Sequence, residues 1–515
     1  MVAPTRTVAP EVTAFLGGGP KKLLIGGRWV DAAAGKTFDT VNPATGETLA
    51  RVAEGDGEDV NRAVIAARAA FDGPWSRLTA AERSAVLYKI ADLIEAHAET
   101  FAQLETLDNG KPYATALRDD VGGTVAYFRY YAGWPTKIHG DTIPVSVVPD
   151  ILGYTLRQPV GVCAQIIPWN YPLMMSAWKL APALAAGCTC ILKPAEQTPL
   201  SALLLGQIML DAGLPEGVVN VLTGFGETAG AALAAHMDID KIAFTGSTEV
   251  GKLIMQAAGR SNVKKVSLEL GGKSPHIVFA DADLAAAKEG AAEGIFYNMG
   301  QDCTAGSRVF VERRVYDEVV QYIADNSKGR TIGNGLDEST EIGPLVSQEQ
   351  LDRVTGYMRI GEQEGARVLS GGARATEGDL AKGYFVQPTV LADARNDMRI
   401  AQEEIFGPNI SVIPVDNFER AIEVANGTQY GLSLSIYTRD VNKAFQAINE
   451  LESGIVYVNA PTIGAEIQLP FGGIKGTGNG HREAGTTAID QFSEIKSVFV
   501  DYSGHLQRAQ IDNRE

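Results

Sequence analysis

Hydrophobic residues recur at helical spacing through the first part of the chain. The segments whose apolar positions lie three or four residues apart are residues 59–71, 80–107 and 114–132. We expect these segments to be structural helices, since nothing in them asks for a chemical role. Before them, residues 22–30 form an alternating pattern around Gly26 and Gly27, which predicts a short hairpin with the glycines at its turn.

From residue 160 to residue 271 the pattern changes to apolar runs separated by helical stretches. The predicted strands are residues 162–167, 189–193, 218–223, 241–245 and 265–270. This alternation predicts a parallel sheet covered by helices, and such sheets bind nucleotides beyond the carboxyl ends of their strands. A second alternation of helices and short apolar strands, from residue 271 to about residue 473, predicts a second α/β unit.

Residues 144–159 have another rhythm, with alternating aliphatic residues around Pro149 and Asp150. This pattern predicts a two-stranded ribbon that projects between helical regions. Because a two-stranded ribbon is rarely stable alone, we expect it to pack against another surface, such as a second subunit. An ordinary edge hairpin is the alternative.

The chain has 515 residues, which is too many for one hydrophobic core, so two or more domains are expected. Its 45% hydrophobic and 21% charged residues are typical of a soluble globular protein. The net charge of -17 argues against nucleic-acid binding, which requires a basic surface. No apolar stretch reaches the roughly 20 residues that cross a bilayer, so we expect no membrane association.

Residues 1–20, which contain Pro, Thr and a Gly-Gly-Gly run, lack a signal-peptide core and are expected to be a poorly ordered lead-in. The four cysteines are too few and too irregularly spaced for a disulfide framework, which suggests a reducing compartment. We therefore expect a cytoplasmic protein. Neither the pair formed by Cys188 and Cys190 nor the histidines have the spacing of zinc ligands, so no metal site is predicted.

Cys303 lies among small and polar residues, between a helical pattern and the apolar run of residues 309–311. A reactive thiolate could lie here. A nucleophilic cysteine needs a base or backbone dipoles close by, because only a few per cent of an unperturbed thiol is ionised at neutral pH. Taken alone, the residue is equally well explained as a small buried side chain.

Further motifs accompany that cysteine. They are Ile166-Ile-Pro-Trp-Asn-Tyr-Pro-Leu, Ile191-Leu-Lys-Pro-Ala-Glu196, Phe244-Thr-Gly-Ser247, Leu268-Glu-Leu-Gly-Gly-Lys273, Glu404-Ile-Phe406-Gly-Pro and Pro470-Phe-Gly-Gly. Glu269 stands inside an apolar segment where the pattern predicts no acid, which makes it a candidate base. In this order and at these spacings, the motifs resemble the NAD(P)-dependent aldehyde dehydrogenase superfamily over roughly residues 23–500.

The resemblance implies an α/β fold with a Rossmann-like cofactor domain, an α/β catalytic domain and a small β oligomerisation arm. The expected divisions are an NAD-binding domain of residues 1–140 and 160–270, a catalytic domain of residues 271–473, an arm of residues 141–159 and 486–503, and a C-terminal tail of residues 504–515. It also implies a homo-oligomer, either a dimer or a tetramer. The tail could cover a neighbouring subunit or the substrate entrance, or simply be solvated.

The same resemblance implies NAD-dependent oxidation of a small-molecule aldehyde to a carboxylate. Cys303 would form a thiohemiacetal, hydride transfer to NAD would leave a thioester, and a water activated by Glu269 would hydrolyse it. The Asn170 amide, on a turn stiffened by flanking prolines, would stabilise the oxyanion. Lys179 and Glu483 match positions that the family uses near the base and in proton relay.

The cofactor site implied by the resemblance extends over several loops. Its expected residues are Ile166, Pro168, Trp169, Lys193, Glu196, Gly226, Gly230, Phe244, Gly246, Ser247, Gly271, Glu404 and Phe406. The segment Gly224 to Gly230 departs from the usual G-x-G-x-x-G pattern and matches the family's own variant. The Glu196 carboxylate would accept a hydrogen bond from a ribose 2'-hydroxyl and repel a 2'-phosphate, so NAD is favoured and NADP is possible.

Met175, Trp178 and Phe471 match positions that line the family's aldehyde tunnel, which suggests an apolar channel, although large apolar residues are more often simple core. Asp302 is similar to a residue of relatives that oxidise cationic aminoaldehydes, whereas the loop containing Glu466 is similar to that of semialdehyde-oxidising relatives. These hints favour opposite substrate charges, so no substrate is named. We expect the Asp302 carboxylate to face solvent or the channel, since it would otherwise raise the pKa of the neighbouring thiol.

Two other functions stay open on the sequence. A CoA-acylating relative would release the thioester with CoA, but such relatives generally lack the base that Glu269 supplies. A noncatalytic protein on the same fold is the second alternative, and the joint presence of Cys303, Asn170 and Lys193 argues against it. Ester hydrolysis by the same thiolate is a conceivable side activity.

Overall fold

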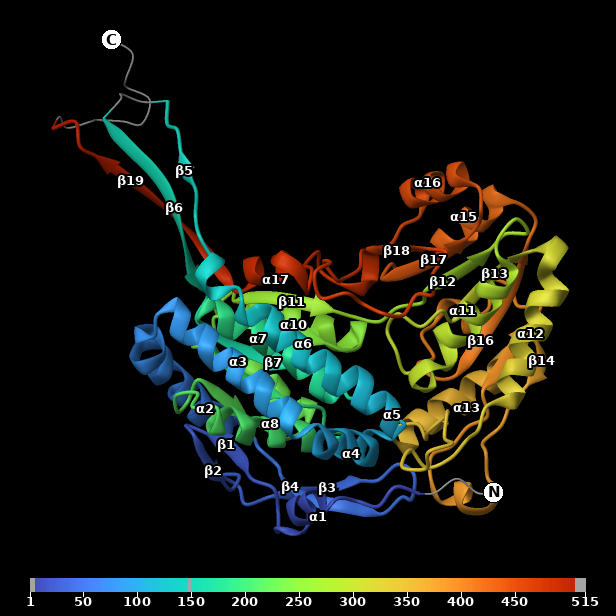
Figure 1. Ribbon diagram of the computed structural model, residues 1–515, viewed down its shortest axis with the longest axis horizontal. Coiled ribbons are helices and arrows are strands. Elements are labelled where there is room, and N and C mark those ends of the chain that lie inside the picture. The colour runs from blue at the N-terminus through green and yellow to red at the C-terminus, as the bar shows by residue number, and fades with distance from the viewer. Residues whose placement is uncertain (1–4, 147–149, 505–515) are drawn as a thin grey trace.

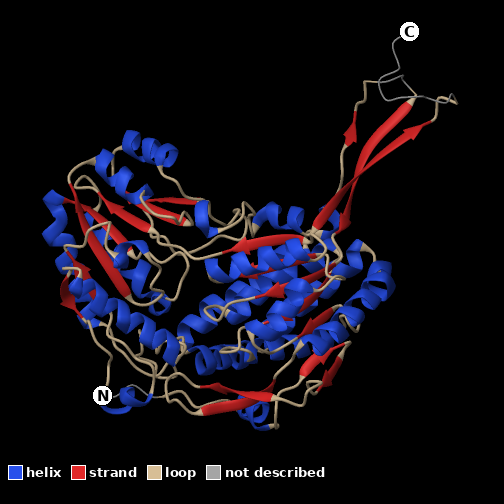
Figure 2. Ribbon diagram, turned by 180° about the vertical axis from the view of Figure 1, so that it is seen from behind, coloured by secondary structure: helices blue, strands red, loops and turns tan. Residues whose placement is uncertain are grey.

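Two seven-stranded sheets form the framework of the described residues, and a three-stranded arm projects from the body (Figure 1). The computed structural model describes residues 5–146 and 150–504. Helices cover both large sheets, as the view from behind shows (Figure 2). The α/β class expected from the alternating pattern is confirmed.

The first sheet contains the five strands predicted between residues 160 and 271, together with the N-terminal hairpin. Its order is β11 (Lys265–Glu269), β10 (Lys241–Thr245), β7 (Val162–Ile166), β8 (Thr189–Lys193), β9 (Val219–Val221), β1 (Leu23–Ile25) and β2 (Arg28–Val30). The first five strands are parallel, and β1 is antiparallel to both of its neighbours. β7 and β8 are buried along their full length, which explains their continuous apolar sequences.

The helices around this sheet follow the predicted helical segments. They are α2 (Gly57–Ala70), α3 (Ala80–Ala96), α4 (Ala98–Asn109), α5 (Tyr113–Thr115), α6 (Gly122–Ala132), α7 (Pro172–Ala186), α8 (Leu200–Asp211), α9 (Ala231–Ala235) and α10 (Thr248–Arg260). Capping boxes at Asp56 and Thr79 start α2 and α3, because each side chain satisfies free backbone NH groups. The segment 80–107 forms two helices because the backbone leaves the helical region at His97.

The second sheet follows the alternation predicted after residue 271. Its order is β14 (Arg367–Ser370), β15 (Thr389–Ala392), β16 (Asn409–Val415), β13 (Arg308–Glu312), β12 (Pro275–Val278), β17 (Ser433–Tyr437) and β18 (Ile455–Val458). Only β14 is antiparallel to its neighbour in this sheet of the described chain. The accompanying helices are α11 (Leu284–Phe296), α12 (Tyr316–Gly329), α13 (Gln348–Gln363), α14 (Arg399–Gln402), α15 (Phe418–Asn426) and α16 (Val441–Glu450).

The projecting arm differs from the predicted two-stranded ribbon. Its strands are β5 (Thr142–Ile143), β6 (Ile151–Pro159) and β19 (Ser493–Asp501), and α17 (Gly485–Gln491) leads into β19. β19 pairs with β6 along all nine residues, whereas β5 pairs with β6 at only two positions. The predicted ribbon is present only as the short pairing of β5 with β6, and the main partner of β6 is β19, from the late segment that the resemblance had assigned to the arm. Pro149 of the predicted turn lies outside the described residues.

The N-terminal segment contradicts the expectation of a poorly ordered lead-in. The helix α1 (Pro10–Gly17) buries Val12 against Leu104 and Leu200, and the backbone NH of Ala9 donates to Gln103 Oε1 at 2.8 Å. Residues 1–4, and residues 505–515 of the predicted tail of residues 504–515, lie outside the described residues. The strands β3 (Thr37–Val41) and β4 (Thr48–Ala53) form a separate antiparallel pair.

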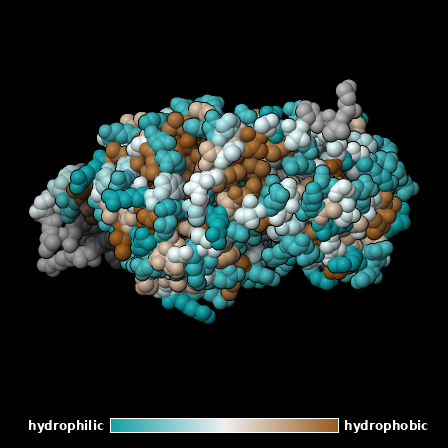
Figure 3. All heavy atoms as spheres, turned by 90° about the horizontal axis from the view of Figure 1, so that it is seen from below, coloured by the Kyte–Doolittle hydropathy of each residue, from teal (hydrophilic) through white to brown (hydrophobic). Residues whose placement is uncertain are grey.

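Short helical turns connect the larger elements. They are η1 (Phe71–Trp75), η2 (Ala116–Val121), η3 (Pro135–Lys137), η4 (Gly226–Gly230), η5 (Tyr297–Gly300), η6 (Arg313–Val315), η7 (Gly378–Lys382) and η8 (Lys475–Thr477). Each large sheet has its own apolar core. In the face shown in Figure 3, hydrophobic side chains gather in small patches within a largely hydrophilic surface. No helix in residues 5–146 and 150–504 is long and apolar enough to cross a membrane.

Candidate active site

The predicted nucleotide-binding edge is formed by the carboxyl ends of four neighbouring strands. In the sheet register, Lys193 pairs with Ile166, Ile166 pairs with Phe244, and the next residue of that strand, Thr245, pairs with Glu269. Residues far apart in the sequence are therefore aligned along one edge. This is the edge at which parallel sheets bind nucleotides.

Glycines keep this edge open and allow close approach of the backbone. A Cβ on Gly230 would lie 3.8 Å from the Lys193 side chain and 4.0 Å from Ile166 Cδ1, whereas the space around Gly226 is open. A Cβ on Gly246 would overlap the Phe244 ring, so only glycine fits there. Ser247 then caps α10, because its Oγ accepts from the Val250 NH at 3.3 Å.

Lys193 and Glu196 lie together at the end of β8. The Lys193 Nζ donates to the Pro194 carbonyl oxygen at 2.9 Å and lies 3.6 Å from Glu196 Oε2. Burial lowers the pKa of Lys193, and the Glu196 carboxylate opposes this effect. The Lys193 side chain is buried, whereas the Glu196 carboxylate that faces it is partly exposed to solvent.

The turn of residues 168–172 is tied to the loop that carries Cys303. The Asn170 amide donates to the Gln301 carbonyl oxygen at 3.1 Å. The Asn298 amide bridges the two segments, because it donates to the carbonyl oxygens of Asn170 at 3.3 Å and of Gln301 at 3.0 Å. On the other side of the turn, Asn109 Nδ2 donates to the Trp169 carbonyl oxygen at 2.7 Å. The predicted oxyanion donor is thus held beside the predicted nucleophile.

The backbone before Cys303 adopts an unusual conformation. Asn298, Met299 and Gly300 have φ values of 47°, 55° and 66°, in the left-handed region that costs free energy for residues other than glycine. A Cβ on Gly300 would overlap the Gly407 carbonyl oxygen. The surrounding hydrogen bonds must therefore hold this loop, and strain of this kind is concentrated at functional sites.

The Cys303 side chain is only partly exposed. Burial raises the pKa of its thiol, and the carboxylates of Asp302, Glu404 and Glu269 raise it further. Asp302 is partly exposed, but the expectation that its carboxylate would leave the thiol pKa unchanged was wrong. Its carboxylate accepts from Tyr171 Oη at 2.7 Å, and from both the NH and Oγ1 of Thr304 at 2.8 Å.

Glu269 ends β11 and is 4% exposed. Neither of its carboxylate oxygens has a hydrogen-bonding partner within the described chain. Burial raises the pKa of Glu269 well above its ordinary value, and the Glu483 carboxylate raises it further, whereas Lys179 and Arg482 lower it. The buried Lys179 ammonium forms an ion pair with Glu483. The three predicted residues therefore form one buried group with more negative than positive charge.

A second loop brings Glu404 and Phe406 toward the nucleophile. Glu404 Oε1 accepts from the Gly272 NH at 2.8 Å, and burial raises the pKa of Glu404 to about 6. A Cβ on Gly271 would overlap the Glu404 carboxylate, which explains the glycine at that position. The Phe406 ring meets Trp169 edge to face, with centroids 5.2 Å apart. A cavity beside this loop is lined by Asp302, Glu404 and Phe406, among others.

Comparison with known proteins identifies the family of the chain. The sequence profile of the aldehyde dehydrogenase family matches residues 29–498. The mitochondrial aldehyde dehydrogenase of Rattus norvegicus is 49% identical over 482 residues, which cover 93% of this chain and 91% of that protein. The chain belongs to the aldehyde dehydrogenase family. Human retinal dehydrogenase 2 is 48% identical over 481 residues, covering 93% of this chain and 91% of that protein.

Solved aldehyde dehydrogenases have the same fold. The NAD+ complex of an aldehyde dehydrogenase from Bacillus cereus superposes with a TM-score of 0.94 at 51% identity, covering 97% of this chain and 100% of that one. An indole-3-acetaldehyde dehydrogenase in complex with NAD+ superposes with a TM-score of 0.91 at 44% identity, covering 93% of this chain and 96% of that one. The superfamily resemblance seen in the motifs is therefore confirmed.

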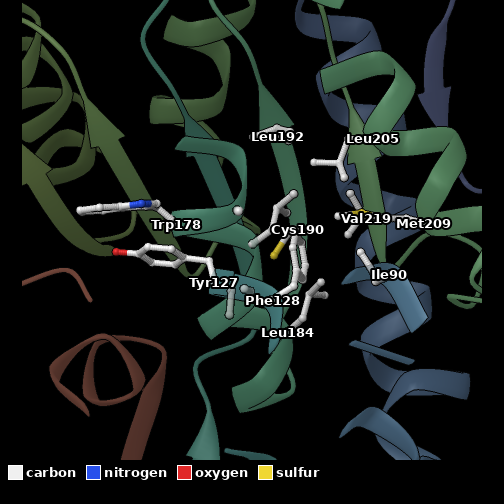
Figure 4. Packing of buried hydrophobic residues seen from close by; sticks show 14 of the residues in the cluster. Ile90, Tyr127, Phe128, Trp178, Leu184, Cys190, Leu192, Leu205, Met209 and Val219 are labelled. Atoms are coloured by element: carbon white, nitrogen blue, oxygen red, sulfur yellow. The ribbon is translucent and has the colours of Figure 1, made fainter. Parts of the chain in front are cut away.

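The three apolar residues expected to line the aldehyde dehydrogenase tunnel lie close to this centre. Met175 and Trp178, both on α7, are 8% and 4% exposed, and Phe471 is 8% exposed. The Trp178 ring meets Phe471 edge to face and stacks on Tyr127, each with centroids 4.9 Å apart. Figure 4 shows Trp178 and Tyr127 lying side by side at the margin of the buried core.

Sequence reasoning missed several residues that hold this aldehyde dehydrogenase site together. Asn298 and Gln301 join the two loops, Tyr171 and Thr304 bind the Asp302 carboxylate, and Arg482 contributes to the charge around Glu269. Only Asn298 had a visible signal, because asparagine tolerates the left-handed region and precedes a glycine by two residues. The other contacts depend on packing between distant segments.

Proposed function

We propose that this chain oxidises an aldehyde to a carboxylate with NAD, through a covalent intermediate on Cys303 that water releases with help from Glu269. The observation that carries the proposal is the state of Glu269. Its buried carboxylate has no hydrogen-bonding partner in the described chain, burial raises its pKa well above the ordinary value, and its charge acts on the Cys303 thiol. A general base works best when its pKa lies near the operating pH.

In the first step the Cys303 sulfur attacks the carbonyl carbon, and the thiol proton passes to a base, for which Glu269 is suited. The carbonyl π electrons move to oxygen and give a tetrahedral thiohemiacetal. The second NH of the Asn170 amide and the backbone NH of Cys303 stabilise that oxygen, because both belong to segments already fixed by the bonds to Gln301. Preorganised donors avoid the cost of reorganisation during the reaction.

When bound, NAD supplies the acceptor for the hydride that leaves the thiohemiacetal carbon. The product left on the protein is a thioester. Glu269 first releases the thiol proton. It then takes a proton from water, whose oxygen attacks the thioester carbon, and the Cys303 sulfur departs as thiolate, leaving an acid that ionises to the carboxylate product. The charges of Lys179 and Glu483 both act on Glu269, and these two residues form an ion pair with each other. This pair provides a route by which the proton leaves the buried base.

The residues along the strand edge fit a dinucleotide. Gly226 and Gly230 leave room above Lys193, and the absence of side chains there suits close approach of a pyrophosphate. Lys193 is positioned to donate to the adenosine ribose, and Glu196 to accept from its 2'-hydroxyl, which favours NAD over NADP. We propose that Glu404 binds the nicotinamide ribose and that Phe406 contacts the nicotinamide ring. Ile166, Pro168, Trp169, Phe244, Gly246, Ser247 and Gly271 complete this proposed site.

We also propose that the chain is a homo-oligomer held by its arm. The arm residues with large exposed apolar side chains are Ile143, Leu152, Leu156, Ile495, Phe499 and Val500, each between 41% and 60% exposed. Apolar surface gathered on a projecting sheet is typical of a protein interface.

The proposed domain division is the one expected from the sequence, with the two large sheets in separate domains. The apolar ring cluster at Trp178 supports an apolar aldehyde channel.

The replacement Cys303→Ala tests the proposed nucleophile. We expect loss of aldehyde-dependent NADH formation, with NAD affinity within a few-fold of the original, because the cofactor edge contains no contribution from that thiol. Turnover is followed by NADH absorbance and NAD binding by calorimetry. Substantial residual oxidation by the variant would remove Cys303 from the mechanism.

A further inference from the structure

A second polar pocket, whose lining does not include Cys303, lies at the amino ends of neighbouring strands in the second sheet. Lys273, Arg308, Asn426, Tyr430 and Glu452 contribute to its lining. Lys273 lies just before β12, and Arg308 is the first residue of β13. The loop from Tyr430 leads into β17, and Glu452 precedes β18, so the pocket gathers groups from four adjacent strand starts.

Lys273 is 2% exposed, and its Nζ has no hydrogen-bonding partner within residues 5–146 and 150–504. Arg308 is fully buried, and among the described residues its guanidinium donates only to neutral oxygens. Those acceptors are the Lys273 carbonyl at 2.9 Å, Asn396 Oδ1 at 3.2 Å, the Val424 carbonyl at 3.4 Å and the Ala425 carbonyl at 3.1 Å. In the described chain, no carboxylate forms an ion pair with either cation.

The charges around the pocket do not balance. The Glu452 carboxylate in its lining is already engaged in an ion pair with Lys475. Burial lowers the pKa of Lys273 to about 7 and that of Arg308 to about 9, because each cation has lost solvent without gaining a paired carboxylate. Glu404, which raises the pKa of Lys273, is bound to the Gly272 NH instead. A buried cation is normally paired, since desolvating an isolated charge is costly.

We propose that this pocket binds a small inorganic anion of halide size, held by the Lys273 ammonium and the positive field of Arg308. An anion here supplies the charge that the protein side chains do not. The Lys273 Nζ is the main donor for direct contact, because carbonyl oxygens already accept from four of the five Arg308 N–H groups. Arg308 therefore acts mainly through its charge. The site is distinct from Cys303 and Glu269, and it adjoins Gly272, whose NH binds Glu404.

Crystals of the whole protein soaked in sodium bromide give a direct test. We expect an anomalous bromide peak in contact with Lys273 Nζ, in the pocket lined by Asn426 and Tyr430. Bromide found only at surface lysines, with none in the pocket, would overturn the proposal. This measurement needs no variant, so it decides the question even where a substitution prevents folding.

Thermal unfolding provides the second measurement. Sodium chloride is compared with sodium methanesulfonate at equal ionic strength, and we expect chloride to give the higher Tm, by about 2 °C, because an anion that binds only the folded state stabilises it. The difference should disappear in Lys273→Met and persist in Lys328→Met, which alters an exposed lysine on α12. An equal chloride effect in Lys273→Met, or a larger effect of phosphate, would contradict a halide-sized site at Lys273.

Discussion

Replacing Lys179 should move the pH dependence of thioester hydrolysis to higher pH. Its ammonium is fully buried, forms an ion pair with Glu483 and lowers the pKa of Glu269. In Lys179→Met that favourable charge is lost while the Glu483 carboxylate still raises the pKa of Glu269. Glu269 acts as a base only when it is ionised. The pH range over which the hydrolysis rate increases, called here the rising limb, must therefore move to higher pH when the pKa of Glu269 increases.

The size of the shift follows from the charges. A neighbouring charge typically changes a carboxyl pKa by about one to three units, so we expect an alkaline shift of about one unit or more. Breaking a buried pair also leaves Glu483 unpaired, and such changes cost about 3–5 kcal/mol of folding stability. Unfolding in denaturant should therefore show a loss of stability in the same variant.

Replacing Glu483, the partner of Lys179, should shift the pH profile of hydrolysis in the opposite direction. Glu483→Gln removes the carboxylate that raises the pKa of Glu269 and leaves Lys179 to lower it, so the rising limb should move to lower pH. Lys252→Met, on the exposed face of α10, serves as the control and should leave the limb unchanged. The assay is single-turnover hydrolysis of the thioester across pH. Shifts of the same sign in both variants, or no shift in either, would refute the reasoning.

Two further predictions concern the cofactor and the arm. Glu196→Gln should improve use of NADP relative to NAD by about tenfold, or about 1.4 kcal/mol, because a carboxylate no longer repels the 2'-phosphate; an unchanged ratio of kcat/KM values would place discrimination elsewhere. Ile495→Asp, which puts a charge on the exposed face of β19, should reduce the mass seen by analytical ultracentrifugation, whereas Ile65→Asp on α2 should not. An unchanged mass for Ile495→Asp would exclude the arm from the interface.

The sequence predicted the parts of the fold that depend on local pattern. The strands ending at Ile166, Lys193 and Glu269 were recognisable because buried parallel strands are continuously apolar. Strands that are consecutive in such a sheet place their carboxyl ends together, so the cofactor edge followed from the same pattern. The helix α1 was missed because Val12 becomes buried only through contact with distant segments.

Long-range contacts account for most of what the sequence did not reveal. The pairing of β19 with β6 joins residues more than 300 positions apart, so it was expected only from the family resemblance and not from any local pattern. The contact between Tyr171 and Asp302 likewise joins segments 131 positions apart. Cys303 itself could be singled out from its motif. The left-handed backbone that presents it depends on bonds made by Asn298 to two different segments.

The release of the thioester tests the proposed mechanism most directly. In Glu269→Gln, rapid mixing of enzyme, NAD and a fast aldehyde should give a burst of NADH approaching one per active site, followed by a steady rate lower by about 10²–10⁴-fold, the usual contribution of a general base. The exposed Glu249 on α10 provides the control, and Glu249→Gln should leave the steady rate unchanged. A steady rate in Glu269→Gln equal to that of the original protein would contradict the account.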